Sequence, residues 1–275
     1  MDYRKEFIVA PGDSVKLDSI DANYTGKIES SEEADAQLEK HHKTLRELQY
    51  LMYAEDKRSL LIVLQGRDAA GKDGTIRKVF SVMNPQGCTV KSFKVPSEVE
   101  AAHDFLWRCH SVVPERGQVT IFNRSHYEDV LVVRVHDLVP QRVWSRRYAH
   151  INAFEELLYD NHTQVLKFFL HIDREEQLER FKKRIDNAAK HWKISDADYA
   201  ERPHWDEYTE AFEVALEKCS TKHAPWFVIP SNNKWFRNLA IAQIVADTMQ
   251  DMNMQFPEPA VDMQEIRRKY HEAAE

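Results

Sequence analysis

Short apolar runs and longer amphipathic stretches alternate along this chain. The apolar runs, which are typical of buried strands, lie at 60–64, 89–95, 118–122, 165–172 and 226–229. Apolar residues recur every three to four positions, which is typical of helices, over about 30–52, 73–83, 97–107, 141–161, 174–189, 204–219 and 234–252. This alternation predicts an α/β fold, in which helices cover both faces of a parallel sheet and ligands bind at the carboxyl ends of the strands.

The remaining segments show weaker patterns. Residues 1–30 have little periodicity, and we expect them to form an arm laid over the core. Ser30 and Glu33 have the spacing of a capping box, which marks the start of the first long helix. The stretch 190–203 is irregular, and a short polar tail follows the last helix. Because no repeat or linker divides the chain, we expect a single domain over 1–275.

Composition narrows the class of protein. The 275 residues are 43% hydrophobic and 30% charged, which is ordinary for a globular protein. No apolar stretch is long enough to span a bilayer, and the first residues lack a secretory apolar core, so we expect a cytoplasmic protein without a membrane partner. The spacing of the three cysteines argues against structural zinc and a disulfide framework. A net charge of −7 argues against nucleic acid as a partner, so any polyanion must be held by local basic clusters.

The first strand runs directly into a glycine-rich segment with the spacing of a phosphate-binding loop. Glycines at 66 and 71 let successive backbone N–H groups converge, and Lys72 adds a positive charge at the start of the next helix. The phosphate site predicted from this segment comprises Gly66, Arg67, Ala69, Ala70, Gly71, Lys72, Asp73, Gly74 and Thr75. A chance glycine-rich turn is the alternative.

Three residues of this loop depart from the usual pattern. Asp73 follows the lysine, where a serine or threonine would normally ligate magnesium, and Thr75 comes two positions late. Asp68 places a carboxylate inside the phosphate cradle. A bridging Mg²⁺ would make that carboxylate compatible with bound phosphates.

A second cluster of polar residues follows the third strand. In P-loop phosphotransferases a second strand usually ends in an acidic residue that organises magnesium, whereas this strand ends at the neutral Asn123. Arg124 can clamp a phosphate, and Glu128 or Asp129 can assist the metal or the acceptor. The alternative is that Arg124 and Glu128, four residues apart, form only a surface ion pair.

The segment 174–193 is basic in an acidic protein, with seven basic and four acidic residues. Arg180 and Arg184 share one helical face, and the apolar face is expected to comprise Leu178, Phe181 and Ile185. Arginines on a lid over about 174–205 would neutralise phosphate charge and exclude water. The alternative is a solvated helix of mixed charge.

These motifs together resemble the family-2 polyphosphate kinases. The resemblance runs from about residue 30 to 255, and three blocks carry it: Gly66–Gly74, Phe122–Leu131, and Glu176-Gln177 with Arg180-Phe181 and Lys190–Lys193. It implies a thymidylate-kinase-like P-loop fold with a helical lid, Mg²⁺, and phosphoryl transfer between polyphosphate and nucleotides. Asn123 with Glu128 is similar to the class III subgroup, which phosphorylates both nucleoside mono- and diphosphates.

The resemblance also implies roles for residues and partners. The implied functional positions are Asp68, Lys72, Arg124, Glu128, Arg180 and Lys190, with Asp68 and Glu128 at the metal. Phosphate or nucleotide contacts are also expected from Asn123 and Arg184. A weaker expectation is a polyphosphate channel formed by Arg67, Arg77, Lys78, Lys91 and Lys94. Adenine nucleotides are the implied partners, guanine nucleotides remain open, and the implied assembly is a homodimer or homotetramer.

The predicted function is magnesium-dependent transfer of the terminal phosphoryl group of polyphosphate to AMP or ADP, reversible in principle. Two alternatives remain at this stage. One is an ATP-dependent nucleoside or nucleotide kinase on the same fold. The other is a non-catalytic protein that binds polyphosphate or nucleotides.

Overall fold

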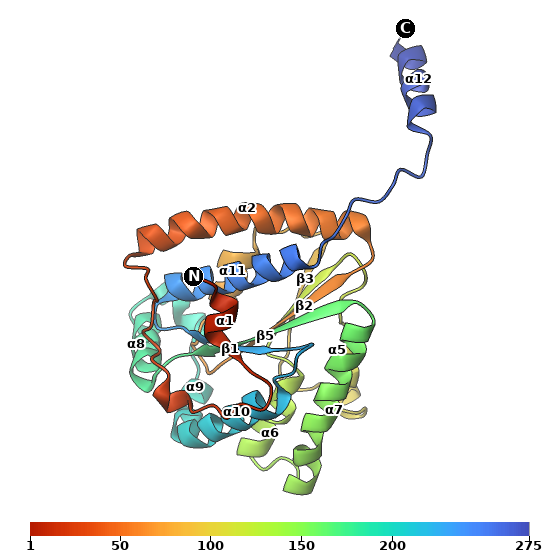
Figure 1. The fold of residues 1–275 in the computed structure, drawn as a ribbon. Coiled ribbons are helices and arrows are strands. Elements are labelled where there is room, and N and C mark those ends of the chain that lie inside the picture. Colours follow the sequence, from red (N-terminus) through yellow and green to blue (C-terminus); the bar gives the residue numbers. More distant parts are fainter. Residues whose placement is uncertain (275) are drawn as a thin grey trace.

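A six-stranded sheet forms the centre of the protein, which is described over residues 1–274 by a computed structural model (Figure 1). The strands, in the order β1-β6-β5-β2-β4-β3, are β1 (Ile8–Val9), β2 (Ser59–Gln65), β3 (Cys88–Ser92), β4 (Val119–Asn123), β5 (Thr163–His171) and β6 (Trp226–Pro230). The pairs among β2 to β6 are parallel, as predicted. The short β1 pairs antiparallel with β6, so the N-terminal arm contributes an edge strand that the sequence did not indicate.

Helices cover both faces of this sheet. They are α1 (Tyr3–Phe7), α2 (Ser31–Glu55), α3 (Lys72–Thr75), α4 (Glu98–Ala101), α5 (Trp107–His110), α6 (Val132–Val135), α7 (Gln141–Asp160), α8 (Arg174–Ile185), α9 (Asp196–Ala200), α10 (Trp205–Cys219), α11 (Lys234–Asp251) and α12 (Met263–Ala274). Helices α2 and α11 lie on one face, and α7 and α10 lie on the other (Figure 1).

Strand β2 is buried along its whole length because both of its faces are covered. Leu60, Ile62 and Leu64 belong to the core beneath α2 and α11, whereas Leu61 and Val63 belong to the core beneath α7 and α10. Because β2, β4, β5 and β6 are parallel, the loops that follow them emerge at one edge of the sheet. The two polar motifs found in the sequence follow β2 and β4 at this edge.

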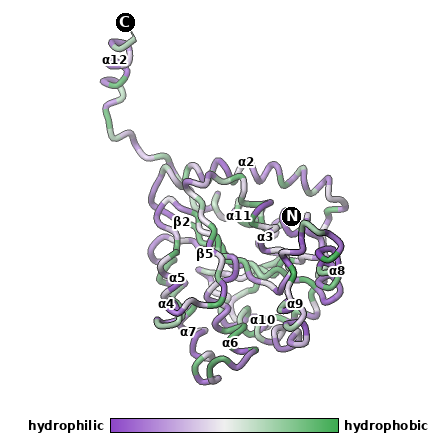
Figure 2. Tube along the Cα trace, turned by 180° about the vertical axis from the view of Figure 1, so that it is seen from behind, coloured by the Kyte–Doolittle hydropathy of each residue, from purple (hydrophilic) through white to green (hydrophobic). Residues whose placement is uncertain are grey.

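Several short elements differ from the sequence prediction. The single helix expected over 97–107 is divided into α4 and α5, and Ser97 closes a capping box at the start of α4. The helix expected over 73–83 consists of α3 and a π-helical turn, Ile76–Phe80. The polar tail contains α12, which extends away from the body (Figures 1 and 2). Within residues 1–274, no helix combines the length and the apolar character required to cross a bilayer.

Candidate active site

The P-loop, residues 66–71, joins β2 to α3 in a conformation that depends on its two glycines. Gly66 has φ +152° and Gly71 has φ +112°. A Cβ atom on Gly66 would lie 2.9 Å from the carbonyl oxygen of Leu170, and one on Gly71 would lie 1.9 Å from Nη1 of Arg237. A side chain at either position would therefore displace the loop from the structure beneath it.

Lys72 is buried at the base of this loop. Its Nζ donates hydrogen bonds to the carbonyl oxygens of Gly66, at 2.7 Å, and Arg67, at 3.1 Å. Burial first, and then the positive charge of Arg124, lower the pKa of Lys72 to about 8. An anionic ligand near Nζ would offset both effects and stabilise the charged amine.

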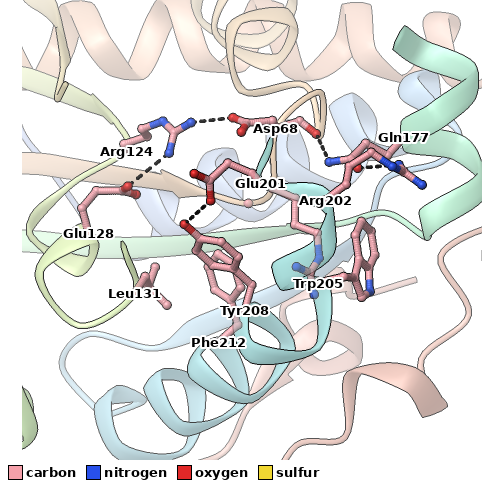
Figure 3. A pocket seen from close by; sticks show the side chains of 12 residues that line it. Asp68, Arg124, Glu128, Leu131, Gln177, Glu201, Arg202, Trp205, Tyr208 and Phe212 are labelled. Carbon is pink, nitrogen blue, oxygen red and sulfur yellow. Dashed lines mark hydrogen bonds and ion pairs between the residues drawn. The ribbon is translucent and has the colours of Figure 1, made fainter. Parts of the chain in front are cut away.

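Arg124 connects the two sequence motifs. It occupies the left-handed region, with φ +61°, in the turn after β4. Its guanidinium donates to Glu128 Oε2 at 3.1 Å and to Asp68 of the P-loop at 2.5 Å (Figure 3). These two carboxylates, Glu128 foremost, raise the pKa of Arg124 above its ordinary value. The expected Arg124–Glu128 pair therefore exists, but it is part of a three-residue bridge across the site and not an isolated surface pair.

Asp129, the carboxylate after Glu128, contacts two other arginines and not Arg124. Asp129 accepts a hydrogen bond from Arg147 at 2.9 Å, and Arg108 lies 3.8 Å away. Burial raises the pKa of Asp129. The sequence could not decide whether Glu128 or Asp129 assists the metal or the acceptor. Of these two, only Glu128 lines a cavity at the site.

A buried polar network fixes the turn that carries Arg124. Within this network, Glu155 of α7 accepts hydrogen bonds from Tyr127, at 2.9 Å, and from Lys167 of β5. His126 Nε2 lies 3.1 Å from the same carboxylate. All four side chains are buried, and their hydrogen bonds tie the segment after β4 to helix α7 and to strand β5.

The two residues that depart from a standard P-loop after Lys72 are Asp73 and Thr75. Asp73 is exposed and accepts a hydrogen bond from Asn123 Nδ2 at 2.8 Å, and Lys193 Nζ lies 3.7 Å from it. Thr75 is buried, and its hydroxyl has no hydrogen-bond partner among the residues that the structure describes. Thr75 also lies outside the linings of both cavities at the site.

Two cavities meet at Asp68 and Arg124, which line both of them. The larger cavity is open and measures about 760 Å³. Its lining is strongly basic, with eleven basic and three acidic residues. The smaller cavity measures about 40 Å³ and is lined on one side by the aromatic rings of Trp205, Tyr208 and Phe212 on α10 (Figure 3).

Most of the predicted site residues line one of these cavities. Arg67, Asp68, Arg124 and Glu128 line the smaller one with Gly66. The larger one contains Ala69, Gly71, Lys72, Asp73, Gly74, Arg77, Lys94, Asn123, Arg180, Arg184 and Lys190. Neither lining includes Ala70, Thr75, Lys78 or Lys91. Of the four expected channel residues outside the P-loop, the larger cavity therefore includes two, Arg77 and Lys94.

Arg180 and Arg184 of the expected lid have different environments. Arg180 is buried and donates to Glu176 and to the carbonyl oxygens of residues 69, 70, 231 and 232, which occupies all five of its N–H groups. Arg184 lies at the larger cavity and donates to the carbonyl oxygen of Lys193 at 2.8 Å. The expected apolar face is wrong, because Leu178 and Ile185 are exposed and only Phe181 is buried.

Sequence reasoning missed part of the site. The rings of Trp205, Tyr208 and Phe212 have the spacing of an ordinary buried helix face, so nothing in the sequence marked them as cavity residues. Arg237 is a single charge within the mostly apolar helix α11, and only the fold places it beneath the P-loop.

Few acidic side chains gather at the site. Within residues 1–274, no group of three or more Asp, Glu, His or Cys side chains is arranged to hold a metal ion. Mg²⁺ at phosphoryl-transfer sites typically takes only one or two protein carboxylates, together with substrate phosphates and water. Asp68 and Glu128, on either side of Arg124, satisfy this requirement.

A buried parallel strand, a glycine-rich phosphate loop with its lysine, and a converging arginine define a P-loop phosphotransferase. Residues 28–257 match the model of the Polyphosphate kinase 2 (PPK2) family, and the chain belongs to this family of enzymes. The chain is 47% identical over 263 residues to an AMP/ADP-polyphosphate phosphotransferase of Meiothermus ruber, covering 95% of this chain and 98% of the relative.

Two further comparisons agree with this assignment. An ADP-polyphosphate phosphotransferase of Rhodopseudomonas palustris is 42% identical over 266 residues, covering 92% of each chain. The crystal structure of Polyphosphate Kinase 2 from Arthrobacter aurescens superimposes with a TM-score of 0.95 at 38% identity, covering 99% of this chain and 97% of that one. The predicted P-loop kinase fold is thereby confirmed.

Proposed function

We propose that this enzyme transfers the terminal phosphoryl group of polyphosphate to AMP and ADP, giving ADP and ATP, with Mg²⁺ as its metal. The observation that carries this proposal is the meeting of two chemically different cavities at the Asp68–Arg124 pair. Polyphosphate occupies the larger basic cavity, and the nucleoside occupies the smaller aromatic one. The transferred group then passes between them at Arg124. The names of the similar relatives support the choice of substrates.

Charge supports the assignment of the larger cavity. Its lining has an excess of eight basic residues, eleven minus three, although the whole chain has a net charge of −7. A linear polyanion requires such a local concentration of positive charge. The open shape also suits a chain that extends beyond the reacting phosphate.

Aromatic side chains support the assignment of the smaller cavity. A nucleobase is flat and apolar on its faces, so it stacks favourably on rings such as those of Tyr208 and Trp205. The guanidinium of Arg67 lies 3.7 Å from the centroid of the Trp205 ring, so this ring already stacks against a planar group that a nucleobase would replace or join. At about 40 Å³ the cavity is smaller than a nucleoside site, so side chains must move apart on binding.

The protein groups act by binding and electrostatics. Lys72 and the P-loop N–H groups hold the phosphate to be transferred, and Arg124 stabilises the charge that develops on it. Glu128 orients Arg124 through their hydrogen bond. Mg²⁺, held by Asp68 and Glu128 with the substrate oxygens, would neutralise phosphate charge. Arg180 fixes the loop through the carbonyl oxygens of Ala69 and Ala70.

The experiment that tests this function omits ATP. The protein is incubated with AMP, Mg²⁺ and polyphosphate, and the nucleotides are separated by chromatography. We expect ADP to appear first and ATP after it. Product formation only after ATP is supplied would indicate the nucleotide-kinase alternative. Binding of polyphosphate without any product under either condition would indicate a non-catalytic protein.

The resemblance also leads us to propose that the enzyme assembles as a homodimer or homotetramer. Light scattering of the purified protein measures this directly, and a mass equal to one chain would contradict it.

A further inference from the structure

Arg237 of α11 is a buried cation without an acidic partner. Only 2% of it is exposed. Its Nη1 donates to the carbonyl oxygen of Ala70 at 3.1 Å, and its Nε and Nη2 donate to Asn238 Oδ1 at 3.2 and 2.9 Å. Within residues 1–274 no carboxylate forms an ion pair with it. By contrast Arg180, which donates to the same Ala70 oxygen, is paired with Glu176.

This guanidinium lies directly beneath the phosphate loop. Cβ atoms built on Gly71 and Gly74 would come within 1.9 Å and 3.3 Å of its nitrogens, so the absence of side chains at these two positions leaves room for it. It also contributes to the lining of the larger cavity. The charge of Arg237 therefore faces the space assigned to the phosphate chain.

Such a charge opposes folding unless something compensates it. Moving an ion out of water is unfavourable, and a buried charge is normally paired with an opposite one. Burial first, and then the positive charge of nearby Arg180, lower the pKa of Arg237 to about 9. Because no carboxylate within residues 1–274 forms an ion pair with Arg237, a bound anion is the partner that would compensate this charge.

We propose that Arg237 is a positioning residue whose uncompensated charge is matched to the bound oligophosphate chain, so that the substrate supplies the negative partner that the protein lacks. It acts through the loop backbone at Ala70, Gly71 and Gly74 and through its field in the cavity. This inference rests on the proposed assignment of the larger cavity to polyphosphate. It adds a fixed cation from α11 to a site that the sequence placed after β2 and β4.

The test compares Arg237→Gln, which removes the charge, with Arg237→Lys, which keeps it. Calorimetry measures the Kd for tripolyphosphate without nucleotide, and thermal unfolding is followed without ligand. For Arg237→Gln we expect a Kd at least tenfold higher and a melting temperature equal to or above that of the wild type. For Arg237→Lys we expect a Kd within about threefold of the wild type. Arg268→Gln on α12 is the control for net charge.

A Kd for Arg237→Gln equal to that of the wild type would overturn the inference. An equal loss of affinity in Arg237→Lys would also overturn it, because geometry and not charge would then be responsible. Lys72→Ala, measured in parallel, separates this result from the proposed function. If Lys72→Ala alone weakens binding, only the role of Arg237 is refuted. If neither variant weakens it, the larger cavity is not the oligophosphate site.

Discussion

Arg124 and Asp68 are 56 residues apart in sequence, yet the guanidinium of Arg124 donates a hydrogen bond to the Asp68 carboxylate. The pair links the turn after β4 to the P-loop after β2, and both residues line both cavities. These are the two residues that both linings have in common. The pair is therefore the place where the two substrates meet in the proposed reaction.

Asp68→Asn keeps the size and hydrogen-bonding capacity of the side chain but removes the charge that faces Arg124 and the metal. We expect activity to fall by about a hundredfold or more, the scale seen when one electrostatic group is removed from an active site. The Mg²⁺ concentration for half-maximal rate should rise, because a carboxylate ligand is lost. A Mg²⁺ dependence identical to that of the wild type would show that Asp68 does not hold the metal.

Lys72 gives the reaction a dependence on pH. Its lowered pKa of about 8 means that the free enzyme holds the charged amine below this pH and loses it as the pH rises. Since kcat/KM reports ionisations of the free enzyme, kcat/KM for polyphosphate should decline above pH about 8. Lys72→Ala should abolish transfer without unfolding the protein. The affinity for tripolyphosphate should also fall above pH about 8 in the wild type but not in Lys72→Ala. Wild-type binding that stays constant to pH 10 would contradict the assignment.

Because the two substrates are assigned to different cavities, a substitution in one cavity should raise KM for one substrate only. Tyr208→Ala should raise KM for AMP by about tenfold, the order expected from 1–3 kcal/mol of base stacking, and leave KM for polyphosphate unchanged. Tyr208→Phe is the matched control, because it keeps the ring. Arg184→Gln should raise KM for polyphosphate and leave KM for AMP unchanged. Steady-state kinetics with each substrate varied separately measures both KM values. If Tyr208→Ala raised KM for polyphosphate and Arg184→Gln raised KM for AMP, the two substrates would occupy the opposite cavities from those proposed.

Arg180 and Arg184 lie four residues apart on α8, but replacing them should affect the stability of the protein differently. Arg180→Gln removes a buried guanidinium that satisfies four carbonyl oxygens, so we expect unfolding free energy to fall by about 3 kcal/mol, since unpaired buried groups cost 1–3 kcal/mol each. Arg184→Gln removes a partly exposed group and should change it by less than about 1 kcal/mol. Urea unfolding measures both. Equal stability of the two variants would contradict the anchoring role of Arg180.

The sequence predicted those features that depend on neighbours along the chain. The P-loop follows its strand, Ser30 caps α2 by accepting from the Glu33 N–H, and the long helices and parallel strands lie within a few residues of their predicted bounds. These features depend on local spacing, which a sequence displays directly. The π-helical turn after α3 and the division between α4 and α5 depend on tertiary packing, so they were missed.

The parts of the site that could not be predicted come from contacts between distant segments. Leu178 and Ile185 have the spacing of a buried face, but Arg180 is buried instead because carbonyl oxygens from two other loops converge on it. Arg237 lies more than 160 residues after the loop that it supports. Only the arrangement of the strand ends brings such groups together.

The most direct test of the central claim is the initial rate measured over a matrix of AMP and polyphosphate concentrations. Two cavities that meet at Arg124 require both substrates to be bound together, with direct transfer of the phosphoryl group between them. Double-reciprocal lines should therefore intersect. Parallel lines would indicate that polyphosphate leaves before AMP binds, through a phosphorylated protein group, and would contradict the account.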